Sequence, residues 1–390
     1  MYPKLRFKEF DDAWEQRKLE DMASFSKGSG YSKSDLIDSG TPLILYGRLY
    51  TKYETVITEV DTYAEEKKSS VFSKGGEVIV PASGETAEDI SVASVVEKSE
   101  VLLGGDLNVI TPSEVLESMF LALNITYGKA HKDMSKLAQG KSVVHLHNAD
   151  LKTIVLQYPS ILEQRKICEF FKSLDNLITL HQRQCEALKK QKRFFLQNMF
   201  PKEGESEPRI RFNGFTEPWE QRKLGELVNF LDTQRKPLEE SKRKKGPYPY
   251  YGASGIVDYV SDYIFDRELI LLSEDGANIT DRNYPVCFLA SGKYWVNNHA
   301  HVLECKAEND NNFICISLER KDFKKFNTGM AMPKLNKETC KIIPVSCTTL
   351  EEQTKIGNFF RELETNITLH QRQYEQLVSL KKYLLSKMFI

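Results

Sequence analysis

The chain has 390 residues, of which 41% are hydrophobic and 28% are charged, values of an ordinary globular protein with room for two or three domains. Lys and Arg total 54 and Asp and Glu total 55, so the formal net charge is −1. This balance excludes a uniformly basic nucleic-acid-binding protein but allows a local basic face. Because no apolar run is long enough to cross a membrane and the N-terminal segment lacks the apolar core of a signal peptide, we expect a cytoplasmic protein. The seven cysteines are scattered without a Cys-x-x-Cys pair, so we expect reduced thiols and no structural zinc site.

The N-terminal segment opens a repeat that dominates the chain. The sequence WEQRKL at Trp14–Leu19 recurs unchanged at Trp219–Leu224, and ITLHQRQ at Ile178–Gln184 recurs at Ile367–Gln373. The middle segments of the two halves are dissimilar; they are roughly residues 23–150 and 228–340. This pattern predicts a duplicated framework with two divergent middles that face different targets. The alternative is a duplicated enzyme whose halves drifted freely, which would have blurred the repeats as well.

The first domain is expected at residues 1–160, including the N-terminal segment. Gly76–Pro81 has the pattern of a buried strand, and a polar turn follows it, so we expect a compact α/β domain. Basic and aromatic residues cluster in its loops, where lysine and arginine can neutralise phosphates. Solvated surface is the alternative for any one of them. The candidate DNA-binding residues of this domain are Tyr46, Arg48, Lys52, Lys67, Lys68 and Ser83.

A long helix is expected at residues 161–200, before the proline at Pro201. Apolar residues recur there at alternating steps of four and three from Ile167 to Met199, the seam of a coiled coil. Residues 349–390 repeat the seam, so we expect the two helices to pair. His and Lys occupy equivalent seam positions in both copies, where they would help to fix the register; these residues are His181, Lys192, His370 and Lys381. The alternative is that each helix packs on its own globular half. Polar residues 201–208 predict a flexible linker.

The second domain is expected at residues 209–348, with a buried strand at Arg267–Leu272 equivalent to the first. Its basic run is followed by an aromatic run, and amide side chains that can read base edges lie further along. The candidate DNA-binding residues here are Arg235, Lys242, Arg243, Lys244, Lys245, Tyr250, Tyr251, Asn278, Asn297, Asn298, His299 and Lys334. Two His-x-His pairs, at His145 and His299, lack a third ligand and are not equivalent, so we expect no metal site.

This layout resembles the specificity subunit of a type I restriction-modification enzyme. The resemblance covers the whole chain and is closest in the second middle, in the motifs YPYYGASG at Tyr248–Gly255, EDGAN at Glu274–Asn278, VNNHAHV at Val296–Val302 and PKLN at Pro333–Asn336. It implies two α/β (α+β) target recognition domains separated by two long antiparallel helices. The first middle retains Glu163-Gln164 but lacks the Tyr-Tyr-Gly element.

The resemblance also implies a function and partners. Each domain would read one half of a split double-stranded DNA site, and the helix pair would set the unread spacer. Two modification subunits would bind the framework and hold S-adenosylmethionine for adenine methylation. Separate restriction subunits would hold ATP and Mg²⁺ and cut the DNA. This chain would bind no cofactor and contain no catalytic residue.

Two other functions remain open from the residues. A self-contained DNA-modifying enzyme would need catalytic carboxylates, for which Glu85, Asp89, Glu274 and Asp275 are the candidates. A coiled-coil scaffold that binds proteins would be consistent with the nearly neutral net charge.

Overall fold

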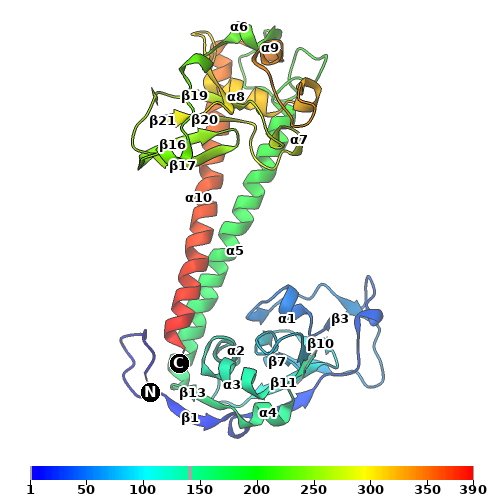
Figure 1. Ribbon diagram of the computed structural model, residues 1–390. Coiled ribbons are helices and arrows are strands. Elements are labelled where there is room, and N and C mark those ends of the chain that lie inside the picture. Colours follow the sequence, from blue (N-terminus) through cyan, green and yellow to red (C-terminus); the bar gives the residue numbers. More distant parts are fainter. Residues whose placement is uncertain (1, 139–142, 390) are drawn as a thin grey trace. The chain divides into compact units, whose positions relative to one another are not determined.

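The computed structural model describes residues 2–138 and 143–389, and the chain divides into two compact units. Unit 1 combines Met1–His181 with Gln373–Ile390, and unit 2 is Gln182–Arg372. Figure 1 shows that each unit combines strands, short helices and part of both long helices. The expected α/β (α+β) class with two long helices is therefore confirmed.

Unit 1 is built on a five-stranded sheet in the order β2-β11-β7-β9-β4. Its strands are β2 (Ala23–Lys27), β11 (Leu107–Pro112), β7 (Glu77–Pro81), β9 (Ser94–Val96) and β4 (Val56–Ile57). A four-stranded sheet follows the order β5 (Tyr63–Ala64), β3 (Thr41–Ile44), β10 (Ser99–Leu103) and β6 (Phe72–Lys74). Two further pairs are β1 (Glu15–Lys18) with β13 (Val155–Tyr158), and β8 (Ser83–Gly84) with β12 (Val144–His145). The short helices are α1 (Arg48–Thr51), α2 (Ser118–Tyr127), α3 (Lys129–Leu137) and α4 (Asn148–Thr153).

Unit 2 has a four-stranded sheet in the order β15-β22-β19-β20. These strands are β15 (Val228–Phe230), β22 (Ala300–Cys305), β19 (Leu269–Ser273) and β20 (Cys287–Ala290). The second sheet follows the order β17 (Gly255–Val260), β16 (Lys245–Gly252), β21 (Lys293–Val296) and β18 (Phe265–Asp266), and β14 (Glu220–Lys223) pairs with β23 (Pro344–Cys347). The short helices are α6 (Leu224–Leu227), α7 (Asn278–Asp281), α8 (Asn311–Glu319) and α9 (Lys337–Lys341).

The two strands expected to be buried occupy equivalent places. Every residue of β7 and of β19 is buried. In each unit the strand pairs antiparallel with both neighbours, and a helix packs beside it, α2 in unit 1 and α8 in unit 2 (Figure 1). The continuous apolar runs read from the sequence are therefore central strands covered on both faces.

The long helices are α5 (Ile161–Asn198) and α10 (Leu350–Met388), and both units contain a stretch of each. In unit 1 the Lys381 ammonium lies 2.5 Å from the Asp175 carboxylate, and in unit 2 Lys192 pairs with Glu364. Late residues of one helix thus meet early residues of the other, so within each unit the helices run antiparallel. A shift of 189 residues converts one ion pair into the other.

The seam residues also enter the globular cores, so both interpretations of the helices hold at once. Ile167 and Phe171 belong to the unit 1 core with Trp14, and Ile356 and Phe360 belong to the unit 2 core. α5 therefore packs into the core of unit 1 through Ile167 and Phe171, and α10 packs into the core of unit 2 through Ile356 and Phe360. The two helices also contact each other.

The repeated segments brace the ends of these helices in the same way. The Leu5 N–H donates to the Lys387 carbonyl at the end of α10, and the Ile210 N–H donates to the Asn198 carbonyl at the end of α5. Such bonds satisfy carbonyls that a helix end leaves without a partner. Segment 201–208, expected as a linker, leads from α5 to this brace and contains turns.

A buried arginine–glutamate pair recurs in both frameworks. Arg6 donates two hydrogen bonds of 2.7 Å to Glu163, and Arg211 donates bonds of 2.7 and 2.9 Å to Glu352. The adjacent glutamine in each copy accepts the N–H at the start of a short helix, Gln164 from Glu117 before α2 and Gln353 from Asp310 before α8. The Glu-Gln dipeptide thus ties each long helix to the helix that covers the sheet.

Candidate nucleic-acid interface

In unit 2, a charge network around Glu274 joins several loops. Glu274 directly follows β19, a strand of the sheet β15-β22-β19-β20. Its carboxylate lies 2.7 Å from the Arg235 guanidinium and 3.4 Å from the Lys334 ammonium. Arg235 also donates to the carbonyls of Asn298 and Ala300, at 3.3 and 2.7 Å. Three candidate residues from distant parts of the sequence, Arg235, Asn298 and Lys334, are therefore brought together.

Next to this network lies His301, which is buried and has both ring nitrogens opposite acceptors. Nδ1 is 2.8 Å from the Asp232 carboxylate and Nε2 is 2.8 Å from the Leu335 carbonyl. Because neither partner can donate, both nitrogens must carry a proton and the imidazole is cationic. Burial lowers the pKa of His301, but the hydrogen bond to Asp232, with a contribution from Cys340, raises it to about 10.

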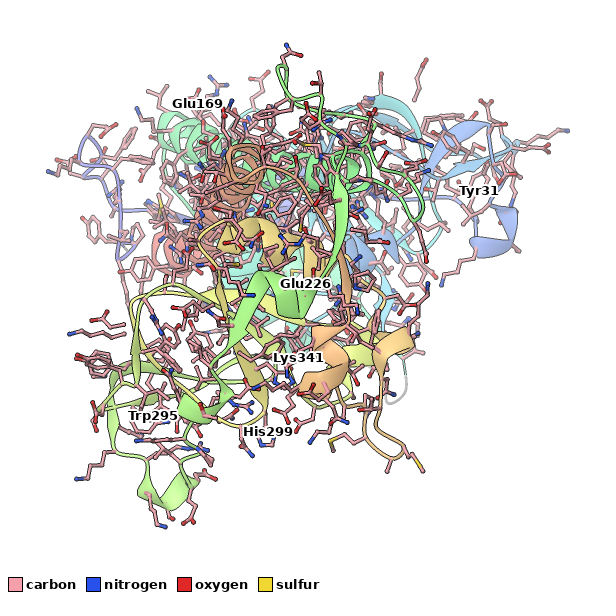
Figure 2. All side chains as sticks on the ribbon, turned by 90° about the horizontal axis from the view of Figure 1, so that it is seen from above. Tyr31, Glu169, Glu226, Trp295, His299 and Lys341 are labelled. Carbon is pink, nitrogen blue, oxygen red and sulfur yellow. The ribbon has the colours of Figure 1, made fainter. Side chains whose placement is uncertain are left out.

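His299 and Asn297 shape the turn between β21 and β22. Figure 2 labels His299 in this turn and Trp295 in β21. Nδ1 of His299 lies 2.9 Å from the Asp275 carboxylate, and the imidazole is half exposed. Asn297 is buried, with its side-chain oxygen accepting the His299 N–H at 2.8 Å, whereas Asn298 is exposed. Of the three, Asn298 and His299 are open to a ligand.

The basic run before and along β16 is only partly free. Lys244 and Lys245 are exposed, and Lys242 lies 2.8 Å from Glu239 at the surface. Arg243 stacks on the Tyr250 ring at 4.7 Å and lies 3.4 Å from Asp258. The lysines can therefore approach phosphates, while Arg243 fixes the strand beneath them.

Several aromatic and amide candidates make contacts within the protein. Tyr250 is buried, and its hydroxyl accepts the Leu238 N–H at 3.0 Å. Tyr251 packs on Phe288 and Tyr294, and burial raises its pKa. Asn278 bonds both ways with the Tyr284 backbone, at 2.8 and 3.0 Å. Tyr250 is therefore closed to a ligand, whereas Tyr251 and Asn278 are partly exposed.

In unit 1 the candidate cations are also largely engaged within the protein. The Arg48 side chain is only 8% exposed and lies 2.7 Å from Glu54 and 2.6 Å from Asp61, which also pairs with Lys52 at 2.8 Å. Together, these lysine and arginine contacts lower the pKa of Asp61 to about 2. Arg48 therefore organises the loops between β3 and β5.

The other unit 1 candidates differ in their access to solvent. Lys67 lies 2.6 Å from Asp35 and stacks on the Tyr31 ring, and Lys68 is exposed. Tyr46 is half buried, whereas Ser83 in β8 is buried with its carbonyl accepting from Tyr50. Lys68 is therefore exposed to solvent, whereas Lys67 is engaged with Asp35 and Tyr31.

Sequence reasoning missed one surface of unit 2, the segment Arg320–Lys334. It carries five lysine or arginine side chains against one carboxylate, and two methionines, Met330 and Met332, are 98% and 61% exposed. Basic and apolar residues alternate along this segment, and that pattern could have indicated a binding surface. Of its residues, only Lys334 is among the candidates expected from the sequence.

Three of the four carboxylates considered for catalysis have structural partners within the protein. Glu274 and Asp275 belong to the contacts described above, and Asp89 accepts a hydrogen bond of 2.6 Å from Thr86, while Glu85 is exposed. Within residues 2–138 and 143–389, no group of three or more His, Cys, Asp or Glu side chains is arranged to hold a metal ion. In the same part of the chain, no helix is sufficiently long and apolar to span a bilayer.

The fold is that of a duplicated protein, in which one framework of ion pairs and helix braces is repeated in two units with different loops. The family model for the type I restriction modification DNA specificity domain matches residues 11–190 and 216–379. The chain therefore belongs to this family, which confirms the resemblance read from the sequence.

Individual relatives agree with the family match. A specificity subunit of a type I restriction enzyme from Haemophilus influenzae is 38% identical over 133 residues, which is 34% of each chain. The chain thus spans about a third of that relative's length. The MjaX specificity subunit of Methanocaldococcus jannaschii is 23% identical over 99% of this chain and 95% of its own. The crystal structure of the type I S subunit from M. genitalium has the same fold, with a TM-score of 0.69 and 16% identity over 100% of this chain and 99% of that one.

Proposed function

We propose that this chain selects the DNA target of a type I restriction-modification complex, with each unit reading one half of a split site. The observation that carries the proposal is the contrast within the family match: the frameworks repeat their ion pairs and helix braces, while the loops of the two units differ. A repeated framework supports equivalent placement of two readers. Different loops support two different half-sites.

Partner subunits would perform the chemistry. Two modification subunits would hold S-adenosylmethionine and methylate adenine, and restriction subunits would use ATP and Mg²⁺ to cut. The chain itself would be non-catalytic and bind no cofactor. We expect the complex to act in the cytoplasm, where chromosomal DNA is accessible.

Exposed apolar residues at equivalent helix positions support two copies of one partner. Leu180 in α5 and Leu369 in α10 are 48% and 49% exposed, and Phe194 and Tyr383 are 51% and 54% exposed. Each pair is separated by 189 residues, the repeat of the helices. Because apolar contacts anchor protein interfaces, a duplicated apolar position suits a partner that binds twice.

The test is a map of methylated adenines in a host that contains the modification partners, with and without this gene. We expect a split motif, methylated in both halves, that disappears with the gene. A motif that persists without the gene would contradict the proposal. Purified chain incubated with DNA, S-adenosylmethionine and Mg²⁺ is the control, and methylation in the absence of partners would instead support the self-contained enzyme.

A further inference from the structure

The loop between residues 327 and 335 of unit 2 presents apolar side chains from an internally braced turn. Thr328 and Lys334 close its base, since the Thr328 N–H and hydroxyl both donate to the Lys334 carbonyl, at 2.8 and 3.0 Å. The Asn327 side-chain oxygen accepts the N–H groups of Gly329 and Lys334, both at 2.9 Å. These contacts hold the two ends of the turn together.

The tip of the turn is compact enough to require glycine. A Cβ added to Gly329 would lie 1.8 Å from the Met332 carbonyl oxygen, far inside van der Waals contact. Met330 at this tip is 98% exposed, and Met332 is 61% exposed. The braced turn therefore holds two thioether side chains close together in sequence where a partner can reach them.

The turn is anchored to the charge network described above. The Gly276 N–H donates to the Pro333 carbonyl at 3.0 Å, and the Leu335 N–H donates to the Glu274 carbonyl at 2.7 Å. The protonated His301 holds the Leu335 carbonyl at 2.8 Å. The segment around Glu274 therefore contacts both this turn and the loop that carries the exposed His299 and Asn298.

Lysines precede and follow the two methionines along the chain. Lys324 and Lys325 before the turn are exposed, and the Lys334 side chain after it is 45% exposed. Lys325 lies 3.7 Å from Glu203, but both side chains are open to water, so the lysine remains available to a phosphate. An apolar tip between lysines matches a duplex, whose bases are flanked by phosphates.

We propose that Met330 and Met332 form an apolar finger that contacts the bases of the half-site read by unit 2, while Lys324 and Lys325 contact the flanking phosphates. This deepens the proposed function and rests on it. Methionine is one of the side chains that proteins place against or between bases, because its chain is unbranched and adaptable. The methionines would contribute to discrimination between base sequences, and the lysines would contribute to salt-dependent binding of any duplex. Their variants can therefore be told apart by experiment.

The experiment uses the assembled complex of this chain with its modification subunits. Binding to a duplex that carries the methylated motif, and to a scrambled duplex of equal length, is measured over a range of salt concentrations. For Met330→Ala combined with Met332→Ala, we expect at least about a tenfold loss of affinity for the motif, little change for the scrambled duplex, and an unchanged salt slope. The loss of base discrimination should fall in one half of the motif only.

Three further variants complete the experiment. Lys324→Ala combined with Lys325→Ala should weaken binding to both duplexes and reduce the magnitude of the slope of log affinity against log salt by about two. Val115→Ala removes an exposed apolar side chain from unit 1 and should leave affinity and discrimination unchanged. Gly329→Ala, which must distort the turn, should reproduce the methionine phenotype while both methionines remain present.

The outcomes are distinguishable. Unchanged affinity and discrimination in the methionine variant, with a wild-type complex that selects the motif, would overturn the finger and leave the proposed function standing. Loss of assembly with the modification subunits would also overturn it and make the turn a protein contact. A wild-type complex that does not distinguish the two duplexes would remove the proposed function together with the finger.

Discussion

At the scale of single residues, His301 shows how a buried side chain can organise a surface. It joins Asp232, just after β15, to Leu335, beside the turn that carries Met330 and Met332. The groups that bear on its charge are Asp232 at 2.8 Å, Glu274 at 3.7 Å and the Cys340 thiol. Its charge therefore depends on groups that belong to three separate segments.

Protonation of His301 makes stability depend on pH. Its pKa is about 10 in the folded chain against an ordinary value of 6.5, so its contribution is complete below pH 6.5 and is lost as the pH rises toward 10. The free energy of unfolding of unit 2 should fall over this window by up to about 1.4 kcal/mol per pH unit, and His301→Gln should remove that component. Urea denaturation of both chains at several pH values measures the difference. Equal pH dependence in the two chains would contradict the assignment.

Substitution of Arg6 measures how much the repeated buried ion pair contributes to stability. The Arg6 and Glu163 side chains are 12% and 1% exposed, so Arg6→Ala leaves a carboxylate buried without its cation. We expect a loss of about 3 kcal/mol in the free energy of unfolding of unit 1, measured by urea denaturation. Arg17→Ala is the matched control, since the Arg17 and Glu15 side chains are 54% and 65% exposed and their pair should contribute less than about 1 kcal/mol. Equal losses in the two variants would contradict this reasoning.

Neither the Arg6–Glu163 pair nor the contacts of His301 were predictable from the sequence, although Arg6 and Glu163 stand in repeated motifs. Arg6 and Glu163 are 157 residues apart, and His301 bonds residues 69 and 34 positions away. Local pattern carries no information on such pairings, because they form only when distant segments pack. The same limit explains why Tyr250 and Arg48 are expected from the sequence to contact DNA. Their residue types suit DNA binding, but the fold buries Tyr250 and pairs Arg48 with Glu54.

At the scale of elements, the long helices were the most predictable part. Their heptad seam, the absence of internal proline and the copy at an offset of 189 all pointed to α5 and α10, and the apolar runs pointed to β7 and β19. The antiparallel sense followed only from the family resemblance, since a seam is compatible with either direction. The small strands of each second sheet, such as β18, were missed because two-residue strands carry no period.

The lysines of the seam specify which residues meet. Lys381→Glu places like charges beside Asp175 and should destabilise unit 1 by roughly 1–2 kcal/mol, and adding Asp175→Lys should recover most of the loss. In unit 2, Lys192→Glu should be rescued by Glu364→Lys and not by Asp175→Lys. Thermal unfolding of the single and double variants provides the comparison, and rescue by the mismatched partner would contradict the register.

At the scale of the whole molecule, duplication implies modular recognition. Replacing residues 23–150 with the corresponding segment of another family member should change one half of the methylated motif and leave the other half unaltered. The Arg6–Glu163 pair lies outside the exchanged segment and is retained. Gln164 is retained as well, and the N–H that it accepts, from Glu117, would be supplied by the equivalent residue of the new segment. Adenine methylation mapping reads the result, with exchange of residues 228–340 as the reciprocal control. A change in both halves would show that the two units do not read independently.

The division of the chain also sets the order in which the units can be completed during translation. Unit 1 needs Leu385, Met388 and Phe389 in its core, whereas all of unit 2 lies within Gln182–Arg372. At about 5–20 residues per second, the ribosome delivers residues 373–389 roughly 10–40 s after residue 181. Until then the apolar face around Phe120 and Phe171 lacks the ring of Phe389 that covers it. The unit that is synthesised first is therefore finished last, and its open core is the part of the nascent protein that a chaperone would need to shield.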